Sequence, residues 1–589
     1  MTRPTVDERR AALQCRHPSW VRTTVDQHLA DAVSEFGDRP LAITDEVTLT
    51  YRQIWDRAEL LAKGLQSVGV RPGDRVAMVM ANHPEFLPLV MAVWRCGAAA
   101  IPVNFLFKAQ ELAYVVGQSQ CRVIITMDTF RGMDYLAMLD DFAPGWRAGH
   151  VDAFPSLARV IVLGNAPVDS GGPAGNAGVS PLDVDGLAAL GASQVEPLPA
   201  VKATPDDAAV VMYTSGTTGL PKGVIQTHDG LRRTAYGTAH HRAFEDGRRI
   251  LFALPLYHAF ALVEGMLACT FVGGAVIPQP IFDPATTFAG IERHRASDLL
   301  LVPTMSVALL EYPDRHRYDV SSMRSLLAGA APTPVWVWEK LRDLFAISEV
   351  FTGYGMTELT ASTVLTAPGD PLEVVSTTVG TPKNAGVAGI EALGWIGTEY
   401  ATCDPFTGAL LPVGAEGELI ARGPTATHGY FANPAETAKL RLPDGWIRSG
   451  DLGRVNAQGY IELTGRSKEL YKTGGELVAP KEVEEVLVKL EGVAQAYVIG
   501  LRDDRWGEIG CAWVVMTPGV AAPSEADVIE WCRARLAKFK LPRHVLFMNA
   551  DELPMTPTGK VQKFRLIEVA QNWLSRSSSL LVGDSSPPD

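Results

Sequence analysis

The chain has 589 residues, which is too long for a single hydrophobic core, so we expect two or more folding units. Hydrophobic residues make up 47% of the chain and charged residues 20%, which is typical of a globular protein. The net charge of −13 argues against nucleic acid as the main partner, although a local cluster of lysines and arginines can still bind an anionic ligand.

The N-terminus has no apolar segment of the kind found in secretory signals. The longest apolar stretches, 87–107 and 251–278, are interrupted by Arg95 and Glu264, which favours buried core over a transmembrane helix. Seven scattered cysteines without a C-x-x-C pair suit a reducing compartment and make a structural zinc site improbable. We therefore expect no transmembrane segment and a cytoplasmic location.

Along the first part of the chain, helical and strand patterns alternate. Residues 24–35 form an amphipathic helical pattern, 76–80 read as a strand, and the alternation continues through 85–126. This order predicts stacked βαβ units with a parallel sheet. Residues 164–205 are rich in Gly, Ala, Pro and Ser, which predicts a loop or linker.

A short apolar run at 208–212 predicts a buried strand, and a hydroxyl-rich and glycine-rich loop follows it. Residues 213–223 read Tyr-Thr-Ser-Gly-Thr-Thr-Gly-Leu-Pro-Lys-Gly. Such a loop suits a polyphosphate, because glycines let backbone N–H groups approach the oxygens, hydroxyls donate hydrogen bonds, and Lys222 neutralises charge. The G-x-x-x-x-G-K-[ST] spacing of the common phosphate-binding loop is not met.

A second folding unit is predicted to begin near Gly465. A helix is expected over 480–490, a strand over 497–501 and another helix over 525–538, which together make a compact unit of domain size. The Ser- and Pro-rich end, 576–589, is expected to be a disordered tail.

Four further motifs follow the loop in order. They are Gly-Tyr-Gly-Met-Thr-Glu at 353–358, Ser-Gly-Asp-Leu-Gly at 449–453, Gly-Arg-Ser-Lys-Glu-Leu-Tyr-Lys-Thr-Gly-Gly at 465–475 and Pro-Met-Thr-Pro-Thr-Gly-Lys at 554–560. With the loop, this order closely resembles the adenylate-forming superfamily, and the run Leu-Ala-Lys-Phe-Lys-Leu-Pro-Arg at 536–543 resembles its acyl-CoA synthetases. The resemblance implies ATP-dependent activation of a carboxylic acid to an acyl-adenylate, release of pyrophosphate, and acyl transfer to coenzyme A.

The resemblance also implies a role for each matching residue. Tyr354 would lie against adenine with Gly355 beside it, Thr357 would contact the α-phosphate, and Glu358 would coordinate Mg²⁺. Asp451 would accept hydrogen bonds from the ribose hydroxyls, and Arg466 would hold ribose or phosphate. The phosphate loop would hold the β- and γ-phosphates through Thr214, Ser215, Gly216, Thr217, Thr218 and Lys222.

Lys560 is the main catalytic candidate, together with Glu358 and Thr214. The resemblance implies that Lys560 bridges the carboxylate and the α-phosphate during adenylation, a task that suits a long and flexible ammonium group. Lys468 matches the hinge position of the family, and the neighbouring pair Gly474 and Gly475 would lie on the CoA side.

The acyl pocket is expected at His258, with a small-residue wall at Gly329, Ala330 and Ala331. A lone histidine on an apolar stretch is more often a packed core residue, so the pocket role of His258 rests on the resemblance. The pattern Phe-Asp-x-Ser, with which amino-acid adenylation domains present an aspartate to the substrate amine, is missing here. That favours an acid without an α-amino group.

The resemblance implies a mixed α/β fold. A large N-terminal domain of βαβ subdomains with a small barrel-like part (1–464) would bind ATP and acid, residues 465–468 would form the hinge, and 469–575 would form a small, mobile α+β lid. ATP, Mg²⁺, CoA and a small carboxylic acid are the expected partners. The oligomeric state stays open, with a homodimer as one alternative.

One segment departs from the family pattern, since the interval 383–403 is longer than usual by about ten residues, a length that surface loops tolerate.

Two alternative functions also stay open. One is an adenylating enzyme that passes the acyl group to a carrier-protein thiol or an amine. The other is a catalytically silent, nucleotide-binding regulatory protein, which the intact Lys222, Glu358, Asp451, Arg466 and Lys560 set argues against. The basic residues Lys538, Lys540 and Arg543 suit CoA phosphates, or else form a solvated face.

Overall fold

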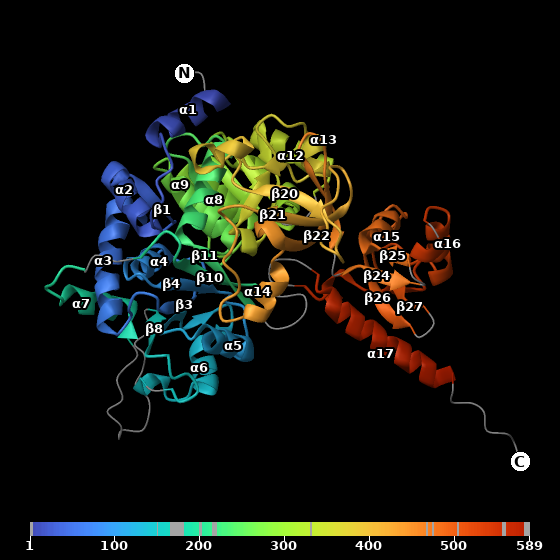
Figure 1. Cartoon of the computed structure of the whole chain (residues 1–589), viewed down its shortest axis with the longest axis horizontal. Helices are drawn as coiled ribbons and strands as arrows, with labels where there is room; N and C mark the ends of the chain where they lie inside the picture. The colour runs from blue at the N-terminus through green and yellow to red at the C-terminus, as the bar shows by residue number, and fades with distance from the viewer. Residues whose placement is uncertain are drawn as a thin grey trace, which may run out of the picture.

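The computed structural model has a large mixed α/β domain and a smaller C-terminal domain, as expected from the sequence (Figure 1). In Figure 1 the large domain runs from blue to orange, and the small domain, in orange and red, lies beside it with α17 (Lys563–Leu581) extending away. The structure describes residues 4–149, 151–164, 182–198, 203–214, 221–329, 333–466, 469–473, 476–503, 506–536, 538–555 and 561–581.

The first of two seven-stranded sheets carries the start of the chain. Its order is β11-β10-β4-β3-β5-β8-β9, and every neighbour pair is parallel except β10 with β11. The strands are β3 (Arg75–Val79), β4 (Ala99–Val103), β5 (Val123–Met127), β8 (Arg159–Leu163), β9 (Leu182–Asp183), β10 (Ala208–Thr214) and β11 (Lys222–Thr227). The helices between them are α3 (Tyr51–Ser67), α4 (Phe86–Arg95), α5 (Ala109–Ser119), α6 (Tyr135–Phe142) and α7 (Val184–Ala192). The expected βαβ alternation is confirmed.

The second seven-stranded sheet has the order β16-β15-β14-β12-β13-β1-β2, and only β2 is antiparallel to its neighbour. Its strands are β1 (Pro40–Ile43), β2 (Thr48–Thr50), β12 (Arg249–Phe252), β13 (Ala275–Pro278), β14 (Asp298–Leu301), β15 (Ser325–Ala328) and β16 (Glu349–Phe351). The accompanying helices are α1 (Val6–Arg16), α2 (Val25–Phe36), α8 (His228–His241), α9 (Ala268–Thr270), α10 (Pro284–His294), α11 (Pro303–Glu311), α12 (Val335–Phe345) and α13 (Leu372–Thr377).

Helix starts follow local capping chemistry. The Thr24 side chain accepts a hydrogen bond from the Gln27 N–H at the start of α2, which confirms the helix expected over 24–35. The Asp283 side chain caps α10 in the same way, and Pro284 occupies its first turn, where a missing N–H costs nothing.

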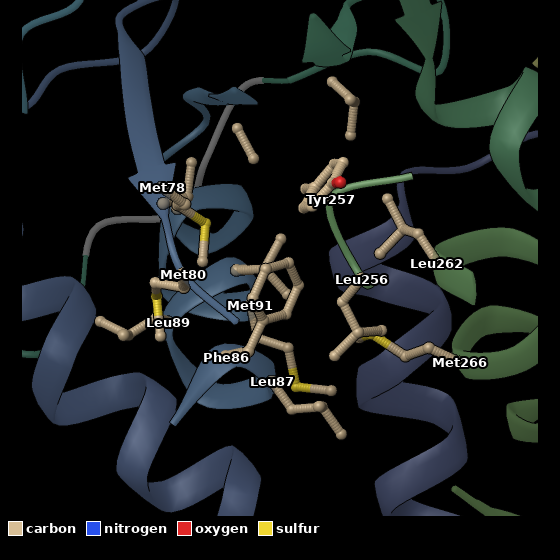
Figure 2. Packing of buried hydrophobic residues seen from close by; sticks show 14 of the residues in the cluster. Met78, Met80, Phe86, Leu87, Leu89, Met91, Leu256, Tyr257, Leu262 and Met266 are labelled. Carbon is tan, nitrogen blue, oxygen red and sulfur yellow. The ribbon is translucent and has the colours of Figure 1, made fainter. Parts of the chain in front are cut away.

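Apolar side chains from both sheets meet in one large core. Figure 2 shows part of this core, in which Met78, Met91, Leu256, Tyr257 and Met266 belong to the same cluster of buried residues. The stretch 251–278 therefore forms core, as expected, and includes a π-helical segment, η2 (Phe260–Leu267). In the described part of the chain, no helix has the length and apolar character needed to span a membrane.

The part of the large domain expected to be barrel-like consists of two small antiparallel sheets. One contains β17 (Gly353–Gly355), β18 (Ser362–Leu365) and β19 (Thr381–Pro382). The other contains β20 (Glu399–Cys403), β21 (Gly417–Arg422), β22 (Ile447–Val455) and β23 (Ile461–Arg466), with α14 (Pro434–Leu440) nearby in sequence. A separate hairpin joins β6 (Thr129–Phe130) and β7 (Met133–Asp134).

The small domain is an α+β unit built on a five-stranded sheet. It contains β24 (Tyr471–Thr473), β25 (Glu476–Val478), β26 (Val493–Asp503), β27 (Gly507–Met516), β28 (His544–Phe547), α15 (Pro480–Leu487), α16 (Glu525–Arg533) and α17. The two helices and the strand expected here are present with shifted ends. The helix α17 continues to Leu581, although the tail was expected to begin at 576, because no glycine or proline interrupts the run before Gly583.

The linker expected over 164–205 is partly wrong. The described residues 182–198 contain β9 and α7, and α7 packs against α3. The Asp183 side chain caps α7, and its buried residues Leu187 and Ala188 join the core. The Ala/Gly-rich composition concealed this helix, since its small residues give a weak amphipathic pattern.

The longer interval 383–403 packs onto α8. The His240 ring contacts the Asn384 carbonyl at 3.1 Å, and Arg233 donates to the Ala388 carbonyl. The interval contains two short 3₁₀ turns, at Gly386–Ala388 and Glu391–Leu393, before β20.

A buried ion pair ties four elements together where this interval begins. Lys383 Nζ lies 2.9 Å from Glu264 Oε1, and the side chains of Lys383 and Glu264 are 4% and 0% exposed. Thr238 of α8 bonds to both residues, and Ser362 of β18 donates to Glu264. Burial lowers the pKa of Lys383, and the Glu264 carboxylate opposes that shift.

We predict that Lys383→Met destabilises the large domain by about 3–5 kcal/mol, because it leaves Glu264 buried without its counter-charge. The double variant Glu264→Gln/Lys383→Met removes both charges and should recover part of that loss. Urea unfolding followed by tryptophan fluorescence measures both. A single variant no less stable than the double variant would contradict the pairing.

Candidate functional site

The two ends of the phosphate-loop motif lie on neighbouring antiparallel strands. Strand β10 ends at Thr214 and β11 begins at Lys222, and these two residues are direct partners across the antiparallel pair. Thr214 and Lys222 therefore lie side by side. The motif residues Ser215, Gly216, Thr217 and Thr218 lie outside the described residues.

Lys222 is held by groups that the sequence analysis did not identify. Its ammonium makes an ion pair with Glu436 of α14 and lies 5.3 Å from the centre of the Tyr430 ring. Hydrogen bonds from Lys222 and Lys439 lower the pKa of Glu436 to about 2. The Glu436 carboxylate therefore stays ionised at any pH suited to an enzyme assay.

The segment 353–358 lies directly beside this strand pair. Gln226 of β11 is 1% exposed, and its side-chain amide donates to the carbonyls of Thr357 (3.0 Å) and Thr360 (2.8 Å). Gln226 thus fixes the 3₁₀ turn Thr357–Leu359, which contains Glu358, against the strand that begins at Lys222. The sequence of β11 marks Gln226 only as a polar position and does not predict this role.

The backbone is strained immediately after that turn. Thr360 has φ of 81°, in the left-handed region that a β-branched residue rarely adopts. Its hydroxyl donates to the Thr425 carbonyl at 2.8 Å, and its own carbonyl accepts the bond from Gln226. Such strain persists where surrounding contacts determine the conformation, and it is common at functional sites.

Glu358 and Lys222 share a neighbour in Tyr430. The Tyr430 hydroxyl donates to Glu358 Oε1 at 2.7 Å, while its ring lies near the Lys222 ammonium. The Glu358 carbonyl also accepts the Thr427 N–H at 2.7 Å. The segment 427–436 therefore holds both the basic and the acidic candidate. Within the described ranges, no group of three or more His, Cys, Asp or Glu side chains is arranged to hold a metal ion.

Tyr354 and Asp451 are joined directly. The Tyr354 hydroxyl donates to Asp451 Oδ2 at 2.6 Å, and the Tyr354 and Tyr400 rings meet edge to face at 6.3 Å. Burial, reinforced by the Asp451 carboxylate, raises the pKa of Tyr354 well above its ordinary value, so the hydroxyl stays protonated. On the sheet, Asp451 of β22 is the register partner of Arg466 of β23. The side chain of Arg466 lies outside the described residues.

The residues expected at the acyl side approach this region from the second large sheet. His258 is exposed and lies two residues before the π-helical segment η2, so it is not a packed core histidine. Asn82 fixes the preceding chain, because its amide donates to the Leu254 carbonyl (2.9 Å) and its oxygen accepts the Leu256 N–H (2.8 Å). Asn82 was not identified from the sequence.

Gly329, which was expected in the acyl pocket, lies next to the 353–358 segment. A Cβ atom on Gly329 would lie 3.7 Å from both the Gly353 carbonyl oxygen and the Phe260 ring. A Cβ atom on Gly355 would lie only 2.1 Å from the Ala361 carbonyl oxygen, so glycine is required there. Ala330 and Ala331 lie outside the described residues.

The described residues also leave out four C-terminal candidates, namely Lys560, Lys468, Gly474 and Gly475. Lys563, at the start of α17, makes ion pairs with Glu469 (2.5 Å) and Glu484 (2.7 Å). In the basic run, Lys540 is paired with Glu482, and the Arg543 guanidinium lies 5.5 Å from the Trp506 ring. Lys481 donates to the Leu463 carbonyl and so connects α15 to β23.

Comparison with known proteins assigns these domains to a family. A family model described as "AMP-binding enzyme" matches residues 29–431, and a model described as "AMP-binding enzyme C-terminal domain" matches residues 482–560. The match to ATP-bound MatB from Rhodopseudomonas palustris has a TM-score of 0.77 at 28% identity and covers 92% of this chain and 98% of that chain.

Curated relatives match the sequence of this chain along nearly its whole length. A methyl-dioxo-octahydroindenyl-propanoyl:CoA ligase of Rhodococcus jostii is 34% identical, with 92% of this chain and 98% of the relative covered. The mitochondrial medium-chain acyl-CoA ligase of Danio rerio is 30% identical, with 94% of this chain and 89% of the relative covered. This protein therefore belongs to the adenylate-forming family of AMP-binding enzymes, and it is an AMP-forming acid–CoA ligase that uses ATP to activate a carboxylic acid and then transfers the acyl group to CoA.

Proposed function

We propose that the ligase activates its acid where the β10–β11 pair, the 353–358 segment and the β22–β23 pair converge. The observation that carries this proposal is the set of direct contacts among them, from Gln226 to Thr357 and from Tyr354 to Asp451. Lys222 of the first motif and Glu358 of the second also share Tyr430 as a neighbour, so residues from three separate sequence motifs lie close together. The first motif would hold the β- and γ-phosphates with Thr214, Ser215, Gly216, Thr217, Thr218 and Lys222.

The remaining nucleotide contacts follow from the same placement. Tyr354 and Gly355 would contact adenine, Thr357 the α-phosphate and Asp451 the ribose hydroxyls. Arg466, opposite Asp451 on β23, would hold ribose or phosphate. On ATP binding, Tyr354 and Asp451 can keep their mutual bond, because a carboxylate has several acceptor positions and only one of its oxygens accepts from Tyr354.

The chemistry has two steps. A carboxylate oxygen of the acid bonds to the α-phosphorus of ATP as the bond from that phosphorus to pyrophosphate breaks, which gives an acyl-adenylate. The thiol of CoA then bonds to the acyl carbon, AMP leaves, and the thiol proton is released. Both steps depend on holding anions together and on preorganised positive charge, which Lys222 and Lys560 would supply.

The residues present fit a Mg²⁺ ion that arrives with the nucleotide. Mg²⁺ binds one or two carboxylates and takes its other ligands from phosphates and water. Glu358 provides one such carboxylate, and only its Oε1 accepts a hydrogen bond, from Tyr430, within the described chain. The ion would neutralise phosphate charge, while Tyr430 would keep the carboxylate oriented.

The acid would enter from the side of His258 and Gly329. We propose a carboxylic acid without an α-amino group, since no Phe-Asp-x-Ser pattern is present. The names of the two relatives described above specify acids as different as a bicyclic propanoate and a medium-chain acid. Neither name includes an amino group on the acid. The wall formed by Gly329, Ala330 and Ala331 would then set the size of acid accepted.

The C-terminal domain would act as a lid. Residues 1–464 would form the nucleotide- and acid-binding domain, 465–468 a hinge that includes Lys468, and 469–575 a lid that carries Lys560 to the acid. Gly474 and Gly475 would border the CoA path. A cytoplasmic location and a homodimer also belong to the proposal, and the first is supported by seven cysteines that are all free, with Cys15 alone exposed.

The assignment of Lys560 is tested by separate half-reactions. We expect Lys560→Ala to slow pyrophosphate release by roughly 10²-fold or more, as removal of one preorganised charge does, and to leave thioester formation from synthetic acyl-adenylate and CoA largely intact. Lys489→Ala, which removes an exposed lysine from the same domain, is the matched control. Equal losses in both half-reactions would contradict the catalytic role. An amine or a carrier-protein thiol supplied in place of CoA tests the alternative acceptors.

The pair of Lys222 and Glu436 leads to a second prediction. ATP phosphates would compete with Glu436 for Lys222, and partly exposed ion pairs contribute about 0.2–1 kcal/mol. We therefore expect Glu436→Gln to lower the KM for ATP by about two- to fivefold, and Lys222→Ala to raise it. Glu416→Gln, which alters a carboxylate paired with Arg454 instead, should change neither. A raised KM in Glu436→Gln would show that Glu436 supports ATP binding.

Two glycine variants separate the nucleotide side from the acyl side. Gly355→Ala should reduce kcat/KM for ATP by about 10²-fold, because the added methyl group displaces the nucleotide segment from the Ala361 carbonyl. Gly329→Ala fits at ordinary contact distance, so it should leave the KM for ATP unchanged and raise the KM for bulky acids. A panel of acids assayed by pyrophosphate release measures both, and an unchanged acid profile in Gly329→Ala would contradict the pocket wall.

A further inference from the structure

We propose that the large domain has a second anion site, suited to the phosphate group of a small molecule, at the opposite end of the second large sheet from the acyl side. A cavity of about 300 Å³ lies there, lined in part by Arg249, Arg295, Arg324, Ser297, Ser321 and Ser322. This volume is at the lower end of the range for small-molecule sites, roughly 300–1,000 Å³.

The topology separates this cavity from the active site. Arg249 is the first residue of β12, Ser297 immediately precedes β14, and Arg324 immediately precedes β15. The three strands are parallel neighbours, so these residues share the amino-terminal edge of the sheet. His258 and Gly329 follow the carboxyl ends of β12 and β15, which is the edge where ligands of open α/β sheets usually bind.

Two carboxylates also line the cavity, but arginines outside it already neutralise them. Asp246 accepts hydrogen bonds from Arg16 (3.0 Å) and Arg39 (2.9 Å). Glu245 is bound by the buried Arg248 at 2.7 Å. None of these three arginines lines the cavity. The charge that the cavity presents to a ligand therefore comes mainly from its own arginines.

The guanidinium groups of Arg324 and Arg249 use few of their N–H donors within the described chain. Within the described chain, the Arg324 guanidinium makes no hydrogen bond and has only a 3.7 Å ion pair with Glu245. The Arg249 guanidinium donates one bond, to the His294 carbonyl at 2.7 Å. Each guanidinium carries five N–H donors in a planar fork, so both groups can bind an anion through two parallel bonds.

Arg295 and Ser321 define a third side. Arg295 is partly engaged, with bonds to Asp319 (2.7 Å) and to the Ser321 hydroxyl (3.4 Å). The Ser321 hydroxyl accepts that bond and is itself hydrogen-bonded to the Asp319 carboxylate, so it helps to hold Arg295 in place at the cavity. Two forks together with the remaining N–H donors of Arg295 exceed what one carboxylate can accept, and they match a phosphate dianion with three terminal oxygens.

The proposal is tested with inorganic phosphate and ribose 5-phosphate, titrated by calorimetry without ATP. The Lys222→Ala background removes the main phosphate-binding lysine proposed for the nucleotide site. We expect saturable binding there, a loss of affinity of about tenfold or more in Arg324→Ala, and no change in Arg293→Ala. Arg293 is the matched control, since it lies nearby on α10, is 63% exposed and pairs with Asp45 outside the cavity.

A second variant keeps the test independent of arginine removal. Ser321→Asp adds a negative charge to the cavity and should abolish binding with Arg324 intact. Tighter binding of ribose 5-phosphate than of phosphate would identify an organic phosphate as the ligand, and equal binding would identify free phosphate. Binding that survives both Arg324→Ala and Ser321→Asp, or that sodium sulfate and sodium acetate reproduce equally at matched ionic strength, would overturn the site. These readouts need no turnover, so they stand apart from any failure of the active-site assignment.

Discussion

Lys383 and Glu264 bring opposite charges into contact in the interior, where the π-helical segment, α8, β18 and the chain after β19 meet. A buried charge is tolerated only when it is paired and hydrogen-bonded, and here Thr238 and Ser362 complete the bonds. The bonds of this pair join η2, which follows β12 of the second large sheet, to β18 of the small sheet that carries Tyr354. The pair therefore constrains how these two sheets lie against each other.

The charged candidate residues of the site each have a partner within the protein. Lys222 is paired with Glu436, Glu358 accepts from Tyr430, and Asp451 accepts from Tyr354. ATP bound as proposed above would compete with Glu436 for Lys222, while Tyr430 and Tyr354 would go on orienting the Glu358 and Asp451 carboxylates. Such preorganised groups need little rearrangement when charge develops during the reaction. Tyr430 is central to this arrangement, because it touches both the cation and the carboxylate.

Much of this organisation was predictable from sequence, because it depends on local patterns. The alternating strands and helices, the strand before the phosphate loop and the order of motifs all repeat within short windows. Gln226, Tyr430, Glu436 and Asn82 were missed because their contacts join residues far apart in the chain. Glu436 meets Lys222 across 214 positions, and no periodicity in either segment encodes that meeting. The helix α7 was missed for a different reason, since its small residues conceal the buried face.

Gly329 separates two kinds of neighbour, and this bears on the choice of acid. On one side lies the Phe260 ring, a side chain that substitution can enlarge, shrink or reorient. On the other side lies the Gly353 carbonyl, which is main chain and is the same whatever residue occupies the position. In the acyl pocket proposed above, substitutions at Phe260 would change the space beside Gly329, while the main chain of the Tyr354 segment would stay in place. Under that proposal, the choice of acid can vary independently of the use of ATP.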